Sequence, residues 1–352
     1  MSALQTSGNH LFVDDTKRGA VLEVAHRMLE EGRIGEAVNG LVAGTRRLRD
    51  SMAPEDWGRF ARAECRNHPT TGLVHQSPYT RRAFEKPRGY PGDAEILDFA
   101  YGCARLPEGT TELGARIYEF ELQTSGSKSA RARRDLLAAM VDDVARQRHL
   151  PRVLSIACGH LREAQISQAV RDGRVGEYVA FDQDPLSLAL VDREHGRLDR
   201  EHRYGDQEHR RQGRVHGHRD SEHSGDHERG FGCIRTVEGS VRSLLARRVE
   251  FNGFDFVYAA GLYDYLSEPV ATKLTGLMFS MLAPGGRLLV ANFAPQWECI
   301  GYLEAFMDWH LIYRNETEMV ELARSIPDQE VSSLSTFRDP YQNLVFLEVH
   351  KR

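Results

Sequence analysis

The sequence predicts an α/β protein in which a doubly wound, mostly parallel sheet follows a helical N-terminal cap domain. Apolar strand-like runs alternate with helical segments from Arg152 onward, which is typical of a parallel sheet covered on both faces. The first strand leads into a tight turn at Gly159, and the second ends on Asp182. Before Arg152 the apolar spacing is helical, apart from one segment rich in proline and glycine.

Composition narrows the function classes. The chain has 352 residues, of which 41% are hydrophobic and 28% charged, enough for a catalytic domain with an accessory domain. A net charge of -5 argues against nonspecific nucleic-acid binding. No signal peptide or membrane span is visible, and the five scattered cysteines are typical of reduced thiols. We therefore expect a cytoplasmic protein.

The N-terminal domain, residues 1–126, is expected to consist of helices around one shaped loop. Apolar residues recur at helical spacing over residues 16–65. Prolines and glycines exclude a long helix over residues 67–102 and favour a rigid loop. We expect a helix to resume at Asp93, and another over residues 128–148 to lead into the first strand.

The second domain, residues 127–352, is expected to contain seven strands. The last two, separated by turn residues, predict a closing antiparallel hairpin. Asp184 can cap a helix that has Pro185 in its first turn. A Pro-Gly-Gly turn over residues 282–286 should precede the fifth strand. The expected strands begin at Arg152 and otherwise cover residues 178–182, 233–237, 254–259, 286–293, 331–337 and 344–349.

An insertion at about residues 192–229 interrupts this alternation. It contains five seven-residue units, each with a histidine in fourth place: His195, His202, His209, His216 and His223. The units lack the apolar positions of a coiled coil, so we expect a flexible, solvated surface excursion after the first unit. A histidine metal site is the alternative, but no fixed scaffold would hold the imidazoles, and no metal is expected.

Gly159 and Asp182 predict a nucleoside site. An acidic residue about 20 positions beyond a glycine turn holds a ribose in doubly wound folds. The turn is not GxGxxG, because His160 and Leu161 follow Gly159. A dinucleotide is therefore not the first choice, and a nicotinamide-dependent oxidoreductase is kept as a rival.

Taken in order, these segments resemble the class I S-adenosylmethionine-dependent methyltransferases over about residues 148–352. The resemblance implies a Rossmann-like fold with S-adenosylmethionine as cofactor. It places the methionine part beside the turn after the first strand, the ribose on the acidic strand end, and the adenine after the third strand. Ser155 and Leu161 depart from the family pattern, and Glu163 could equally be an exposed helix residue. The implied cofactor-binding residues are Ala157, Cys158, Gly159, Glu163, Asp182, Gln183, Ser240, Val241, Ala260 and Gly261.

Residues 78–102, 182–188 and 309–314 are similar to a bacterial group described as extracellular factor 3-hydroxypalmitate methyl ester synthases. The resemblance implies methyl transfer to the carboxylate of a 3-hydroxy fatty acid. An arginine can grip such a carboxylate with two hydrogen bonds. The alternatives are ion pairs for the arginines, a packed helix position for the histidine and core positions for tyrosines. The candidate catalytic and substrate contacts are Arg88, Tyr90, Tyr263, His310, Tyr313 and Arg314.

Other functions stay open at this point. An O- or N-methyltransferase of another small metabolite would share these residues, and so would a noncatalytic cofactor-binding protein of the same fold. A nucleic-acid methyltransferase is disfavoured, because the Asp/Asn-Pro-Pro-aromatic motif and a strongly basic domain are both missing. The expected partner is a small-molecule substrate, and a homodimer stays open.

Overall fold

The computed structural model describes residues 15–195 and 231–352. Most of the predicted histidine-rich insertion lies outside the described residues. Its expected flexibility and the alternative of a metal site concern those residues and stay predictions. The chain divides into two compact units. One contains the described residues up to Ser127 together with Glu298–His310, and the other contains Lys128–Trp297 and Leu311–Arg352.

The first unit is built of helices, and proline sets where several of them begin. Pro54, Pro69 and Pro78 each occupy the first turn of a helix, where the missing N–H would have no partner anyway. The helices are α1 (Asp15–Glu30), α2 (Ile34–Ser51), α3 (Pro54–Arg59), a π-helical stretch (Phe60–Cys65), α4 (Pro69–Val74), α5 (Pro78–Glu85), α6 (Ala94–Tyr101), α7 (Glu112–Glu121) and α14 (Ile300–Phe306).

Asp93 fixes the loop that is rich in proline and glycine. Its carboxylate accepts the Ile96 N–H at 2.9 Å, which caps α6 where the sequence predicts that the helix resumes. Both carboxylate oxygens also accept from Arg82, at 3.2 and 2.7 Å. Lys86 and Gly89 have positive φ, and the Gly89 N–H donates to the Lys86 carbonyl at 2.8 Å. The segment between α5 and α6 is therefore tied at both ends.

Helix α14 belongs to the first unit, although it lies far along the chain. Gly301 packs so closely on α2 that an added Cβ would lie 2.5 Å from the Thr45 carbonyl carbon. Glu304 accepts from Trp57 Nε1 at 2.6 Å and from Arg49 Nε at 2.9 Å. The sequence predicted a single domain boundary near residue 126. Residues 298–310 belong to the first unit instead, because long-range packing holds them there.

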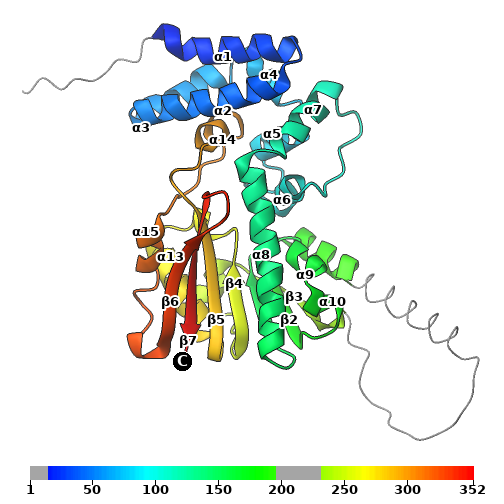
Figure 1. The fold of residues 1–352 in the computed structure, drawn as a ribbon, viewed down its shortest axis with the longest axis vertical. Coiled ribbons are helices and arrows are strands. Elements are labelled where there is room, and N and C mark those ends of the chain that lie inside the picture. Colours follow the sequence, from blue (N-terminus) through cyan, green and yellow to red (C-terminus); the bar gives the residue numbers. More distant parts are fainter. Residues whose placement is uncertain (1–14, 196–230) are drawn as a thin grey trace, which may run out of the picture. The chain divides into compact units, whose positions relative to one another are not determined.

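The second unit contains a seven-stranded sheet (Figure 1) in the order β3-β2-β1-β4-β5-β7-β6. All neighbouring strands are parallel except the pairs made by β7, which is antiparallel to β5 and β6. This topology confirms the predicted doubly wound fold of the class I methyltransferases, including its closing hairpin. The strands are β1 (Arg152–Ile156), β2 (Glu177–Asp182), β3 (Ile234–Glu238), β4 (Phe254–Ala259), β5 (Leu282–Phe293), β6 (Val331–Arg338) and β7 (Leu344–Lys351).

Helices cover both faces of the sheet (Figure 1). On one face, Ile156 and Val257 belong to a buried cluster that includes Leu274 of α13 (Glu268–Ser280). The opposite face carries α8 (Ser125–Gln147), whose Asp143 accepts from Arg287 of β5 at 3.2 Å. Further helices are α9 (Arg162–Ile166), α10 (Gln168–Arg171), a helix over residues 185–195, α12 (Val241–Leu245) and α15 (Glu316–Glu321).

The fifth strand begins earlier than the sequence predicts. Leu282 already pairs with Phe254, but the next pair is Arg287 with Phe256, so the intervening residues bulge out of β5. Gly285 provides the positive φ within this bulge. The predicted Pro-Gly-Gly turn is therefore an irregularity inside the strand. Among the helices that the structure describes, none is both long and apolar enough to cross a bilayer.

Candidate functional site

The loops that follow β1, β2, β3 and β4 meet at the carboxyl edge of the sheet. Ile156 pairs with Phe181, and Asp182 pairs with Glu238, so these strands end side by side. Chain order reverses at β1, which lies between β2 and β4. Ligands of doubly wound folds bind at such a switch point. Eight of the ten predicted cofactor residues lie at these strand ends or in the loops that follow them, Val241 is the first residue of α12, and Glu163 lies in α9.

The turn after β1 is held in an unusual backbone conformation. Ala157, Gly159 and Leu161 have φ values of 55°, 54° and 50°. Leu161, which departs from the second glycine that the resemblance implies, adopts the left-handed conformation that a glycine would adopt. This costs a non-glycine residue roughly 1 kcal/mol. Burial of the Leu161 side chain, 1% exposed, offsets that cost.

Asp182 joins this turn to the end of β2. One carboxylate oxygen accepts the Gly159 N–H at 2.8 Å, and the other accepts the Asp184 N–H at 2.9 Å. Burial raises the pKa of Asp182, and the two N–H donors oppose that shift. Each carboxylate oxygen has two lone pairs, so each can accept a further hydrogen bond. The carboxylate is thus oriented by backbone and can still bind a pair of hydroxyl groups.

Glu163 is buried beneath the same turn, in contrast to the alternative of an exposed helix residue. The Tyr258 hydroxyl donates to its Oε1, and the Tyr258 and Tyr178 hydroxyl oxygens lie 2.6 Å apart. Burial raises the pKa of Glu163, against the effect of the bond from Tyr258.

The loops after β3 and β4 bring backbone close to this edge. An added Cβ at Gly239 would lie 2.5 Å from Phe181 Cε2, so only glycine fits there without movement. The Gly239 N–H donates to the Asp182 carbonyl at 2.8 Å. Ser240 and Ser243 form a capping box that begins α12 and fixes the position of Val241.

Arg133 of α8 is a residue of this edge that the sequence analysis did not select. Its side chain is 3% exposed, and Nη1 donates to the Ala260 carbonyl at 2.6 Å. A Cβ added to Gly261 would lie 3.8 Å from Nη2. A signal was present, because Arg133 precedes Leu137 and Val141 at intervals of four on the apolar face of the predicted helix.

Two predicted substrate contacts of the second unit lie in its interior. Tyr263 is fully buried, and its hydroxyl lies 2.8 Å from Thr275 Oγ1. Arg314 is 4% exposed and donates to the carbonyls of Tyr263 and Leu266 at 2.8 and 2.5 Å. Both side chains therefore have core contacts, and Arg314 ties residues 311–315 to the loop after β4. Tyr313 is half-buried in that segment.

Three other predicted contacts lie in the first unit. Arg88, half-buried, has Nη2 at 3.6 Å from Glu95 Oε2 and Nε at 4.0 Å from Asp93 Oδ2. Tyr90 is half-buried in the same loop, and exposed His310 has Nε2 at 3.2 Å from Asp308 Oδ1. The ion pairs of Arg88 match the alternative that the sequence left open for it.

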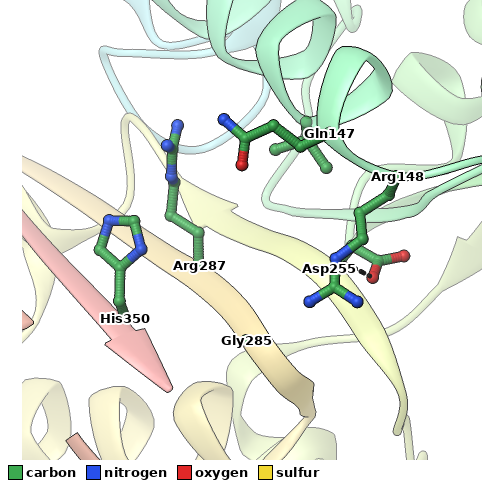
Figure 2. A pocket seen from close by; sticks show the side chains of 7 residues that line it. Gln147, Arg148, Asp255, Gly285, Arg287 and His350 are labelled. Atoms are coloured by element: carbon green, nitrogen blue, oxygen red, sulfur yellow. Dashed lines mark ion pairs between the residues drawn. The ribbon is translucent and has the colours of Figure 1, made fainter. Parts of the chain in front are cut away.

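The opposite, amino edge of the sheet has its own polar depression (Figure 2). Arg287 Nε lies 3.1 Å from Glu348 Oε1, and Arg148 Nε lies 3.9 Å from Asp255 Oδ1. His350 Nε2 lies 3.3 Å from the same Glu348 oxygen. Arg148, Arg287 and His350 thus each have an acidic neighbour at this edge.

Comparisons with known proteins agree with the fold. No family model matches the chain, and no curated protein matches it. A possible exported protein from Bordetella parapertussis is similar over 85% of this chain and 99% of its own, at 15% identity and a TM-score of 0.50. Magnesium protoporphyrin IX methyltransferase from Synechocystis PCC 6803, with bound S-adenosylhomocysteine, covers 72% of this chain and 92% of its own, at 10% identity and a TM-score of 0.40.

Proposed function

We propose that the chain is an S-adenosylmethionine-dependent methyltransferase that acts on a small molecule. The observation that carries this proposal is the Asp182 carboxylate. It stands at the switch point of the sheet, aligned by the N–H groups of Gly159 and Asp184, with acceptor capacity left on both oxygens. Two adjacent acceptors suit the vicinal hydroxyls of a ribose.

The other residues of the carboxyl edge fit the rest of this cofactor. Ala157, Cys158 and Gly159 would pass beside its methionine part, and buried Glu163 would attract the ammonium group. Gln183, Ser240 and Val241 would flank the nucleoside, with Gly239 admitting close approach of the backbone. Ala260 and Gly261 would close the site from β4. The solved structures of similar fold include a methyltransferase with bound S-adenosylhomocysteine.

The proposed chemistry requires mainly alignment. S-adenosylmethionine supplies a methyl group on sulfonium, and the sulfur keeps the bonding electrons while a lone pair of the acceptor forms the new bond. The task of this chain is then to orient the two reactants and exclude water. A carboxylate acceptor is already ionised at neutral pH and needs no general base.

The acceptor that we propose is the carboxylate of a 3-hydroxy fatty acid, giving a methyl ester. It rests on the similarity of residues 78–102 to methyl ester synthases and on the basic Arg88 within a fixed loop. Tyr90, His310 and Tyr313 are further proposed contacts, while Arg314 and Tyr263 would position the loop after β4. We also keep a cytoplasmic location in the proposal, supported by five scattered cysteines that are never paired as CxxC.

Calorimetry with S-adenosylhomocysteine tests the cofactor assignment. We expect binding by the wild type and strongly weakened binding by Asp182→Ala. Preference for NADH, or undiminished affinity in the variant, would contradict the proposal. Methyl-labelled S-adenosylmethionine with a lipid and metabolite extract, followed by mass spectrometry, tests the acceptor. A labelled ester supports the proposed substrate. A labelled ether or amine indicates that the acceptor is another small metabolite, and tight cofactor binding without a labelled product indicates a noncatalytic role.

A further inference from the structure

The guanidinium of Arg133 is a buried cation with incomplete bonding. Nε has no hydrogen-bond partner, and Nη1 donates to a neutral carbonyl, that of Ala260. Among residues 15–195 and 231–352, no carboxylate lies within ion-pairing distance of this side chain. A charged group 3% exposed with an unsatisfied donor is unfavourable by several kcal/mol in general. A ligand that brings a carboxylate would relieve this.

The surroundings of Arg133 indicate where such a ligand would lie. Burial raises the pKa of both Glu163 and Asp264, and the positive charge of Arg133 acts against that rise, so its guanidinium lies within electrostatic reach of both carboxyl groups. Gly261 presents only backbone toward the Nη atoms, with 3.8 and 3.9 Å between them and a built Cβ. A cation and an acid, Glu163, thus flank the end of β4 and the turn after β1.

We propose that Arg133 and Glu163 form a binding site for an α-amino acid zwitterion, in which Arg133 holds the carboxylate and Glu163 holds the ammonium group. The inference rests on the proposed function, because the zwitterion would be the methionine end of the cofactor. It assigns a ligand contact to α8, ahead of the first strand. Arginine suits this task because its planar fork can make two parallel bonds to a carboxylate.

Three nucleosides separate the contributions. S-adenosylhomocysteine has both charged groups, its decarboxylated aminopropyl analogue keeps only the amine, and methylthioadenosine has neither. A charge-assisted bond contributes about 1.5–3 kcal/mol, which corresponds to roughly 10- to 100-fold in affinity. For Arg133→Gln, calorimetry should therefore show S-adenosylhomocysteine weakened by that factor. Binding of the other two compounds should change less than about threefold.

The matched control is Arg134→Gln, which removes the same charge from the adjacent residue of α8. Arg134 pairs with Asp135 at 2.7 Å, and its charge, like that of Arg133, opposes the raised pKa of Glu163, so this variant measures the effect of a nearby charge without the proposed contact. We expect its three affinities to stay close to those of the wild type. Arg133→Lys keeps the positive charge but removes the two parallel hydrogen bonds that a guanidinium can make. This variant should lose part of its affinity for S-adenosylhomocysteine and none of its affinity for the other two compounds.

The outcomes are distinct. Wild-type protein that binds none of the nucleosides overturns the proposed function and this inference together. Wild-type binding with equal loss of all three compounds in Arg133→Gln overturns the inference alone and leaves Arg133 as the support of the Ala260 carbonyl. Equal losses of affinity for S-adenosylhomocysteine in Arg133→Gln and Arg134→Gln would mean that long-range charge, and not a direct contact with Arg133, causes the effect. If Arg133→Gln does not fold, judged by circular dichroism, Arg133→Lys and the wild-type preference for S-adenosylhomocysteine over its decarboxylated analogue decide.

Discussion

The amino and carboxyl edges of the sheet both contain arginines and carboxyl groups, but the pKa values of these carboxyl groups are shifted in opposite directions. At the amino edge, hydrogen bonds from Arg146 and the charge of Arg287 lower the pKa of Asp143, even though desolvation acts the other way. At the carboxyl edge, burial raises the pKa of Asp182, Glu163 and Asp264.

The comparison separates charge that stabilises the fold from charge available for a ligand. Arg148, Arg287 and His350 at the amino edge have acidic neighbours and partial exposure to water, so the protein itself satisfies them. Figure 2 shows the pair that Arg148 forms with Asp255. At the carboxyl edge, carboxyl groups are held away from water, and buried Arg133 has an unsatisfied Nε. Perturbed groups gathered at one edge of a sheet are typical of a functional site.

Asp182→Asn should give the largest effect on cofactor binding. If the carboxyl edge binds no ligand, the substitution will have no such effect, and the contrast between the two edges will be wrong. The amide nitrogen cannot accept the Gly159 N–H, and acceptors for a ribose are lost. At about 1.5–3 kcal/mol per charge-assisted bond, we expect roughly 100-fold weaker binding of S-adenosylhomocysteine. Calorimetry measures this, with thermal unfolding as a control for folding. A loss below about threefold would remove Asp182 from the site.

Asp264→Asn tests whether burial at the carboxyl edge favours the protonated form of a carboxyl group. Burial raises the pKa of Asp264 to about 6 from its ordinary 3.8, against the hydrogen bond from the Phe293 N–H. The folded state therefore favours the protonated acid. Its stabilising contribution is complete below pH 3.8 and is lost as the pH rises to about 6.

The asparagine keeps an acceptor for Phe293 and carries no proton to lose. Between pH 4.5 and 7, the wild type should lose about 2 kcal/mol more of its free energy of unfolding than the variant does. Urea denaturation at the two pH values measures the difference. Parallel losses in the two proteins would show that Asp264 titrates normally.

Gly239→Ala and Gly285→Ala compare close packing at the two edges. The new Cβ at Gly239 would meet the buried Phe181 ring, which costs about 1–3 kcal/mol in a packed interior. At Gly285 it would meet the end of flexible Arg148, so only the positive φ costs roughly 1 kcal/mol. We expect cofactor affinity to fall only for Gly239→Ala, as seen by calorimetry. Equal affinities would place the adenine elsewhere.

Arg287→Gln should give the smallest effect. It breaks the pairs with Asp143 and Glu348, which are partly exposed, and such pairs contribute about 1 kcal/mol or less. Chemical denaturation should show a small loss that shrinks at high salt, with cofactor affinity unchanged. A loss of cofactor binding would mean that the two edges are coupled.

Local patterns in the sequence predict much of the fold. The strand run 254–259 is found with those bounds, and Asp93 caps α6 where the helix was expected. The closing hairpin also follows from alternation and turn residues, because both signals act between near neighbours. The inserted bulge in β5 was missed, since its register is set by pairing with distant Phe254.

The residues of the candidate site could be selected from the sequence only in part, for the same reason. Gly159 and Asp182 have a characteristic spacing, but nothing local indicates that Leu161 would adopt a left-handed backbone or that Glu163 would be buried. Residues 298–310 join the first unit only because α14 packs on α2 through Gly301. These features depend on contacts between residues that are far apart in the chain.

By itself, the sequence determined the sheet, its helical N-terminal region and the acidic end of β2, because periodicity and turn chemistry are local. Only the tertiary structure decided which charges lack partners. Arg133 and Arg287 are both arginines near apolar residues in the sequence, yet one is paired with carboxylates and the other is buried against a carbonyl. Burial and pairing depend on the neighbours that folding provides, and those neighbours come from separate helices and strands.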